Sequence, residues 1–291
     1  MRRWIVRVLV AVAVLLVGLG VYGVLVEPRL ILDEDRLEVT LPRLDERWAG
    51  TEVALLSDLQ VGMWWANTGM VERAVRRAVE AEPDVVLLGG DFLYSSSPSI
   101  AEQVDTVLEL LDPLVDAGIP TFAVLGNHDL AVGAADELTA MLEGAGIPVL
   151  TNESAPVPGG SGPGGLYVVG VGPALRDVAD AEEALGEVPD GAARVVLAHN
   201  PTVFPDLPAG SAPLALAGHT HCGQVVIPGV PFSYVGLTEE EARVAEGWAP
   251  EGYGEPGNRL FVTCGLGFSH LPVRINAPPE LVLVELRPAG G

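Results

Sequence analysis

Residues 84–91 read DVVLLGGD, a run of branched apolar residues that stops abruptly at two glycines and an aspartate. A short run that is apolar on both faces is typical of a strand in a sheet covered on both sides. The same pattern recurs at 52–56 before Ser57-Asp58, at 121–125 before Gly126-Asn127-His128-Asp129, at 194–198 before His199-Asn200-Pro201, and at 213–217 before Gly218-His219-Thr220-His221. These five runs predict strands of a covered sheet.

Helical patterns separate the first three of these strands. Residues 68–81 begin at an Asn67/Thr68 cap and end before Pro83, and residues 99–117 end at Gly118. Strand and helix in alternation predict an α/β fold. The second half is richer in strands: we expect a third helix at 134–143, further strands at 166–171, 224–227, 259–263 and 281–286, and surface loops at 156–165 and 238–257.

Composition narrows the class of partner. The 291-residue chain is 49% hydrophobic, with a mean hydropathy of +0.36, so a large core is available. Acidic residues outnumber basic ones 39 to 16, a formal net charge of −23, whereas nucleic-acid binding draws on clustered cations. We therefore expect no nucleic-acid partner. Two cysteines also exclude a multi-disulfide scaffold and a cysteine-based zinc cluster.

The N-terminus carries an uncharged apolar run at residues 8–26, preceded by Arg2, Arg3 and Arg7. As a helix, these 19 residues would extend roughly 28 Å, about the thickness of a bilayer core. A cleaved signal peptide is the alternative, but the run exceeds a usual signal core and lacks a clean Ala-x-Ala site. We favour a retained transmembrane helix. Because positive residues stay cytoplasmic, the rest of the chain should lie outside the cytoplasmic membrane.

The polar residues at the strand ends are of the types that bind metals. The carboxyl ends of strands in an α/β sheet meet at one edge, where ligands usually bind. Four of the five histidines of the chain stand at these ends. The side chains expected to meet there are Asp58, Gln60, Asp91, Asn127, His199, His219 and His221.

The order of these motifs resembles the calcineurin-like metallophosphoesterase superfamily: Asp-x-Gln, Gly-Asp, Gly-Asn-His-Asp, a lone His, and Gly-His-x-His. GHTHCGQ at 218–224 and GLGFSHLPVRINAPPE at 265–280 are similar to its membrane-associated bacterial branch. The resemblance covers about residues 37–286. It implies a four-layer α/β/β/α sandwich at residues 37–287, after an N-terminal anchor, or an uncleaved signal, at residues 1–27.

The resemblance also implies a binuclear metal centre. Asp58, Gln60 and His221 would bind the first metal, Asn127, His199 and His219 the second, and Asp91 would bridge both. Two divalent cations about 3.5–4 Å apart acidify a bridging water and clamp the phosphoryl oxygens, so the nucleophile would be a bridging hydroxide. Neutral imidazole and amide ligands would leave this site positive despite the acidic surface.

Two motif positions carry further expectations. His128 is expected to protonate the leaving oxygen, with Asp129 orienting its ring. Gln60 stands where the superfamily usually has His, and its harder oxygen ligand favours Mn²⁺ or Mg²⁺ over Zn²⁺, with iron also a candidate. An inactivated first-metal site is the alternative interpretation of Gln60.

Weaker candidates lie near these motifs. Trp64 and Trp65 would rim a substrate pocket, enter the membrane interface or pack in the core, and His270 would contact substrate or lie on the surface. The run Glu239-Glu240-Glu241 reads as a solvated helix face. The resemblance places Gly at Cys222 and a site loop at Cys264, so the two cysteines form either a disulfide or two free thiols.

The sequence therefore predicts a single-pass, membrane-anchored metallophosphoesterase that hydrolyses a phosphomonoester, phosphodiester or pyrophosphate. The anchor favours a phospholipid-like or nucleotide-diphosphate-lipid substrate. The alternatives are a soluble-nucleotide phosphodiesterase and a catalytically degenerate, metal-dependent binding module. No obligate protein partner is evident.

Overall fold

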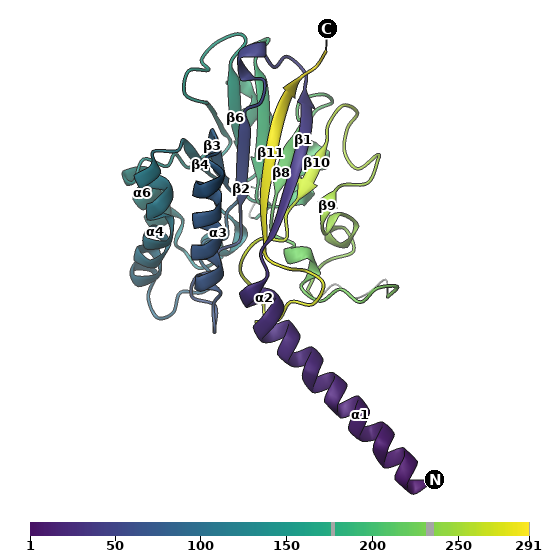
Figure 1. Ribbon diagram of the computed structural model, residues 1–291. Helices are drawn as coiled ribbons and strands as arrows, with labels where there is room; N and C mark the ends of the chain where they lie inside the picture. The colour runs from purple at the N-terminus through teal and green to yellow at the C-terminus, as the bar shows by residue number, and fades with distance from the viewer. Residues whose placement is uncertain (176–177, 231–235, 291) are drawn as a thin grey trace.

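The computed structural model describes residues 1–175, 178–230 and 236–290. They form two mixed β-sheets that share one apolar core, helices that cover the outer faces, and an N-terminal helix that projects away from the domain (Figure 1). The α/β class expected from the alternating strand and helix patterns is confirmed.

The first sheet has the strand order β1-β11-β2-β3-β4. Its central strands β2, β3 and β4 are parallel, while β11 is antiparallel to β2 and parallel to β1. The bounds are Asp33–Leu41 for β1, Glu52–Leu56 for β2, Val85–Leu88 for β3, Thr121–Ala123 for β4 and Glu280–Pro288 for β11.

The second sheet has the order β5-β6-β7-β8-β10-β9. The four central strands are parallel, and β5 and β9 add antiparallel edges. The bounds are Glu153–Pro156 for β5, Leu166–Val171 for β6, Ala193–Ala198 for β7, Ala215–Ala217 for β8, Gly247–Trp248 for β9 and Leu260–Val262 for β10.

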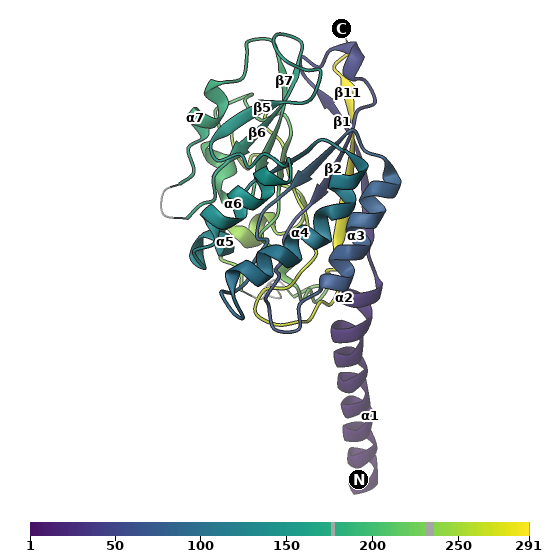
Figure 2. The same ribbon diagram turned by 90° about the vertical axis from the view of Figure 1, so that its left-hand side faces the viewer.

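Three helices, α3 (Thr68–Ala81), α4 (Ile100–Ala117) and α6 (Ala135–Gly144), pack on the outer face of the first sheet (Figure 2). Helix α4 begins where the Ser99 hydroxyl accepts from the Glu102 N–H, and ends at Gly118 in a left-handed conformation, φ 68°. The outer face of the second sheet packs against α7 (Ala181–Gly186), η3 (Pro201–Asp206) and η5 (Glu241–Val244).

Residues 2–30 form one continuous helix, made of α1 (Arg2–Val21), the π-helical turn η1 (Tyr22–Val26) and α2 (Glu27–Leu30). This helix is long and apolar enough to cross a membrane. A signal sequence near the N-terminus meets the same two criteria. The last turns of the helix belong to the domain, because Gly23, Glu27 and Pro28 are buried.

The site end and the anchor end of the domain coincide. Strand β1 follows α2, and its first residue Asp33 pairs with Glu280 at the start of β11. Because β11 runs antiparallel to β2, with Val282 opposite Leu55, the carboxyl end of β2 lies at the same end of the sheet.

The structure differs from the expected elements in several places, and β5 and α7 are among the elements that were not expected. Residues 224–227 do not form a strand: Val225 makes one isolated bridge to Ile275, and Gln224 is left-handed, with φ 54°. Residues 238–257 include η5 and β9 rather than a loop alone. Strand β1 escaped prediction because five of its nine residues are charged, as suits an edge strand.

Candidate functional site

The seven side chains expected to bind metals come from five strand ends. Asp58 and Gln60 follow β2, and Asp91 follows β3. Asn127 opens the short helix α5 (Asn127–Ala131) after β4, while His199 follows β7, and His219 and His221 follow β8.

The backbone at these strand ends is strained. Asp58, Gln60 and Asp91 have φ values of 59°, 52° and 52°, and His219 and His221 have 74° and 50°. Non-glycine residues rarely adopt this left-handed conformation, and it concentrates at functional sites. Strands β2, β3 and β8 therefore end in sharp turns that redirect polar side chains into the site.

Small residues make room for the two carboxylates. A Cβ at Gly126 would lie 2.0 Å from Oδ1 of Asp91, and one at Gly218 would lie 2.4 Å from Oδ2 of Asp58. Both distances are shorter than any tolerable contact, so the two carboxylates occupy the space that side chains at these glycines would fill.

Asp91 is the centre of the cluster. Its ligand atom and those of His199 and His219 all lie within 4.8 Å of one another. Asp91 Oδ2 accepts from Nε2 of Gln60 at 2.8 Å and lies 3.3 Å from Nε2 of His199. Burial opposes ionisation, yet the imidazoles of His199, His128 and His219 hold the pKa of Asp91 well below its usual value.

The complementary shift occurs on His199. Burial lowers the pKa of this ring, but the Asp91 carboxylate outweighs burial and raises it to about 9. Its Nδ1 donates to the carbonyl of Gly89 at 2.7 Å, which leaves Nε2 as the atom that faces the cluster. The shifts of both groups have one cause, because the buried Asp91 carboxylate stabilises positive charge beside it.

A second group surrounds Asp58. Its carboxylate accepts from the backbone N–H of His219 at 3.1 Å and lies 3.4 Å from Nε2 of His221. Burial, together with the guanidinium of Arg274, lowers the pKa of His221 to about 4. The ring is therefore neutral at neutral pH, the state in which imidazole binds a metal.

The donor set fits divalent cations. Within the described residues, Oε1 of Gln60 and Nε2 of His199 are buried and have no hydrogen-bond partner. Leaving a buried polar atom unpaired costs about 1–3 kcal/mol. The Gln60 amide presents its nitrogen to Asp91, so it must rotate to offer its oxygen. Asn127 Oδ1 accepts from Asn200 Nδ2 at 3.2 Å.

The contacts of Asp129 correct one expectation. Its oxygens accept from the backbone N–H groups of Leu93 and Gly126, both at 2.9 Å, so it fixes the turn rather than the His128 ring. Burial, reinforced by the charge of Asp91, raises the pKa of Asp129 to about 7.

The His128 ring is held by a different residue, Tyr94. The ring Nδ1 lies 3.3 Å from the carbonyl oxygen of Tyr94, and the two rings stack with centroids 4.9 Å apart. Because a carbonyl only accepts, Nδ1 carries a proton and Nε2 is the atom that can exchange one with a substrate.

Two residues near the ligands were not predicted from the sequence to belong to the site. Glu241, expected on a solvated face, accepts from Nε2 of His219 at 2.8 Å. That hydrogen bond, with those from Thr238, lowers the pKa of Glu241 to about 2. Arg274 is fully buried and donates to the carbonyls of Cys264, Gly265, Gly267 and Ala277. Its one sequence signal is its place in the late VRINAPPE stretch.

A cavity of about 250 Å³ opens on the cluster. His270 lines it, as do Asn127, His128, His219, His221 and Glu241. Trp64 and Trp65 lie outside, 60% and 53% exposed, with the Trp64 indole donating to the carbonyl of His270 at 3.3 Å.

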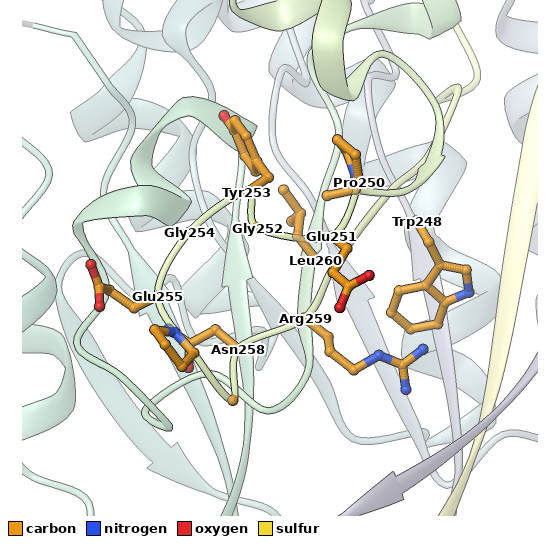
Figure 3. A pocket seen from close by; sticks show the side chains of 13 residues that line it. Trp248, Pro250, Glu251, Gly252, Tyr253, Gly254, Glu255, Asn258, Arg259 and Leu260 are labelled. Atoms are coloured by element: carbon orange, nitrogen blue, oxygen red, sulfur yellow. The ribbon is translucent and has the colours of Figure 1, made fainter.

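A larger cavity, of about 520 Å³, lies elsewhere, along residues 248–260 (Figure 3). It contains none of the strand-end residues, and Arg259 stacks on Trp248 with 4.1 Å from guanidinium to ring centroid. We assign the chemistry to the smaller cavity, because only it holds the convergent polar side chains.

The two cysteines are joined. Cys222 and Cys264 form a disulfide with their Cα atoms 4.7 Å apart, inside the range that a disulfide requires. The bond ties the loop that carries His221 to the loop that precedes Gly265 and Leu266.

The chain is similar to known phosphoesterases. A model of the calcineurin-like phosphoesterase family matches residues 51–223, more than half of the chain. Phosphodiesterase YaeI of Escherichia coli is 31% identical, over 81% of this chain and 82% of that protein. An uncharacterized metallophosphoesterase of Helicobacter pylori (strain 26695) is 27% identical, over 92% of this chain and 66% of that protein. The crystal structure of a dimetal phosphatase from Danio rerio is similar, with a TM-score of 0.43 and 11% identity, over 75% of this chain and 88% of that one.

Proposed function

Since the chain belongs to the calcineurin-like phosphoesterase family and is a metallophosphoesterase, we propose that it hydrolyses a lipid-linked phosphoester at a membrane surface. One observation carries the proposal: the metal-capable strand ends and the apolar N-terminal helix lie at the same end of the domain. The substrate is phospholipid-like, or a nucleotide-diphosphate-lipid.

We assign Asp58, Gln60 and His221 to a first metal, and Asn127, His199 and His219 to a second. Asp91 lies between the two groups, 2.8 Å from Gln60 Nε2 and 3.3 Å from His199 Nε2, and is assigned as the bridge. Oε1 of Gln60 and Nε2 of His199, both buried and without a hydrogen-bond partner, support this assignment.

When bound, two divalent ions would supply positive charge for the phosphoryl oxygens and would lower the pKa of the attacking water. The residues around them do the positioning. Asp91 holds the backbone N–H of His128 at 2.8 Å, which fixes that ring at the cavity. His128 then gives a proton from Nε2 to the leaving oxygen, with Nδ1 bonded to the Tyr94 carbonyl.

The ligand set favours Mn²⁺ or Mg²⁺. Two carboxylates and two amides supply oxygen atoms, which these harder ions prefer, and Gln60 replaces an imidazole that would suit Zn²⁺ better. Iron is compatible with the three histidines of the set.

We further infer that the chain belongs to the membrane-associated bacterial branch, with residues 1–27 as a retained anchor and residues 37–287 as a four-layer catalytic domain. The buried Glu27 carboxylate accepts from the backbone N–H groups of Asn276 and Ala277 at 3.0 and 2.7 Å. A helix that is bonded to the domain in this way supports retention over cleavage.

Orientation follows from the flanking charges. Arg2, Arg3 and Arg7 precede the apolar run, so the N-terminus is assigned to the cytoplasm and the catalytic domain to the outer side of the cytoplasmic membrane.

The proposal is tested on the full chain reconstituted in lipid nanodiscs and loaded separately with Mn²⁺, Mg²⁺ and Zn²⁺. Each preparation is given phosphodiesters and pyrophosphates that share one headgroup, with and without an acyl chain. We expect faster turnover of the acylated member, and the highest rate with Mn²⁺ or Mg²⁺. Faster turnover of the soluble member would favour a soluble nucleotide, and no turnover with two bound ions would favour a binding module.

A further inference from the structure

The N-terminal helix contacts the domain inside its own apolar run. Residues 8–26 are uncharged, and Gly23 lies within them. The carbonyl of Gly23 accepts from the backbone N–H of Arg274 at 2.8 Å. A Cβ at Gly23 would lie 2.6 Å from Cγ1 of Ile275, so only glycine permits this approach.

This contact leaves no spacer between membrane and domain. The 19 residues of the run extend roughly 28 Å as a helix, about one bilayer core. If the whole run spans the core, the contact at Gly23 lies about one helical turn from its outer end. The loop that carries Arg274 and Ile275 therefore lies at the outer edge of the hydrocarbon core, next to the lipid headgroups.

Exposed apolar side chains lie in the loops that carry this contact or are bonded to it. We define the apolar rim as Trp64, Trp65, Ile227, Val230 and Leu271, which are 45–60% exposed.

Hydrogen bonds and a cation–π contact tie the rim to the helix base. The N–H of Val226, next to Ile227, donates to the carbonyl of Ile275 at 2.9 Å. The Arg29 guanidinium lies 5.0 Å from the centroid of the Trp65 ring and donates to the Trp65 carbonyl at 2.7 Å.

We propose that the apolar rim inserts into the headgroup region of the outer leaflet, so that the metal-site cavity opens directly at the bilayer surface. The proposal rests on the retained anchor of the proposed function. A lipid occupant is favoured over a protein because the rim is bonded, through Trp65 and Arg29, to the base of a helix that is able to cross a membrane. Paired tryptophans at such a depth are typical of a membrane interface.

The rim borders the cavity directly. Trp64 donates to the carbonyl of His270, a residue that lines the cavity, and the carbonyl of Leu271 accepts from Gln224, another lining residue, at 2.8 Å. A headgroup phosphate would therefore reach the site from the membrane plane without leaving the bilayer.

The test is tryptophan quenching in the full chain. The protein has five tryptophans, and Trp4 lies on α1, so a Trp4→Phe background removes the emission of the anchor. This variant is placed in nanodiscs of phosphatidylcholine, with or without bromine near the headgroup end of the acyl chains. We expect brominated lipid to reduce the emission, and the reduction to disappear in W4F/W64F/W65F, in which Trp48 and Trp248 remain.

A second measurement places a nitroxide at Leu271→Cys or, as the control, at Ala209→Cys. Ala209 is exposed in the turn before β8, at the opposite ends of the strands, and the native cysteines are bonded to each other. The Leu271 label should collide more with dissolved oxygen than with a water-soluble relaxant, and the Ala209 label should do the reverse.

Neither readout depends on turnover, so the two proposals fail separately. Mass spectrometry of the purified protein reports whether residues 1–30 are retained. If residues 1–30 are retained, unquenched emission or equal behaviour of the two labels would contradict insertion of the rim into the membrane. The rim would then be assigned to contact with a protein. Loss of these residues would overturn the anchor as well.

Discussion

Nε2 of His219 lies 2.8 Å from Oε1 of Glu241, although 22 residues separate the two in the chain. An ionised carboxylate only accepts, so Nε2 carries the proton and Nδ1 presents its lone pair. A carboxylate behind a ligand histidine fixes the tautomer and the ring orientation of that ligand. Glu241 is thus assigned as a positioning residue for the second metal.

Glu241→Ala should weaken metal binding about 10- to 100-fold, because the ring loses its tautomer and its anchor. Competition with a chelating dye measures the affinity, and nitrogen NMR of the imidazole reports the tautomer. Glu241→Gln keeps an acceptor and should lose less. The matched control is Glu239→Ala, an exposed acid of the same run. Equal affinities for the Glu239 and Glu241 variants would remove the assignment.

His128→Ala should keep its metal ions and lose roughly 10²–10⁴-fold in turnover on a substrate with a poor leaving group. With p-nitrophenolate as leaving group the loss should be much smaller, because that anion leaves without a proton. Tyr94→Phe is the control, since it keeps the stacked ring and the backbone carbonyl that bonds Nδ1. The same loss on both leaving groups would argue against a proton donor.

Glu280 is predicted to make stability depend on pH. Its carboxylate accepts from the Thr263 hydroxyl and the Cys264 N–H, and burial raises its pKa to about 7. The folded protein therefore holds a proton that the unfolded chain releases near pH 4.3. Between about pH 4.3 and pH 7 the folded state binds more protons, so this group makes stability fall as pH rises through that window.

Glu280→Gln should remove this dependence, which amounts to about 4 kcal/mol over the full window. Melting temperatures of variant and wild type in the same detergent are compared from pH 4 to pH 8. The difference, variant minus wild type, should rise through the window as the other titrating groups cancel. A difference that stays constant with pH would show that Glu280 is not buried in a protonated form.

The sequence predicted the strands that carry the site because each of them is a buried apolar run ended by polar residues. The sequence predicts β2 and β6 at their observed bounds, and β3 and β7 within one residue. Strand β8 was placed two residues early, because Pro213 and Leu214 are apolar without joining the ladder. The polar residues of the site directly follow these apolar runs in the sequence, so their positions can be predicted from it.

Contacts between residues far apart in the sequence could not be predicted. Nothing within the acidic run at residues 239–241 separates Glu241 from its neighbours, and only the folded loop brings it to His219. The Asn-His-Asp motif suggested that Asp129 holds the His128 ring, whereas the turn geometry gives that carboxylate two backbone N–H groups instead. The contacts of Gly23 and Glu27 with residues 274–277 could not be predicted either, because the composition of their segment indicates only a membrane anchor.

The proposed chemistry depends on one binuclear metal centre bridged by Asp91, and elemental analysis of Asp91 variants tests this centre most directly. Wild type should carry two divalent ions per chain, Asn127→Ala should lose mainly one, and both Asp91→Ala and the isosteric Asp91→Asn should lose both together with phosphodiester hydrolysis. Circular dichroism of each variant confirms that the fold is kept. Two ions retained in a folded Asp91→Ala protein would contradict the bridge and the site built around it.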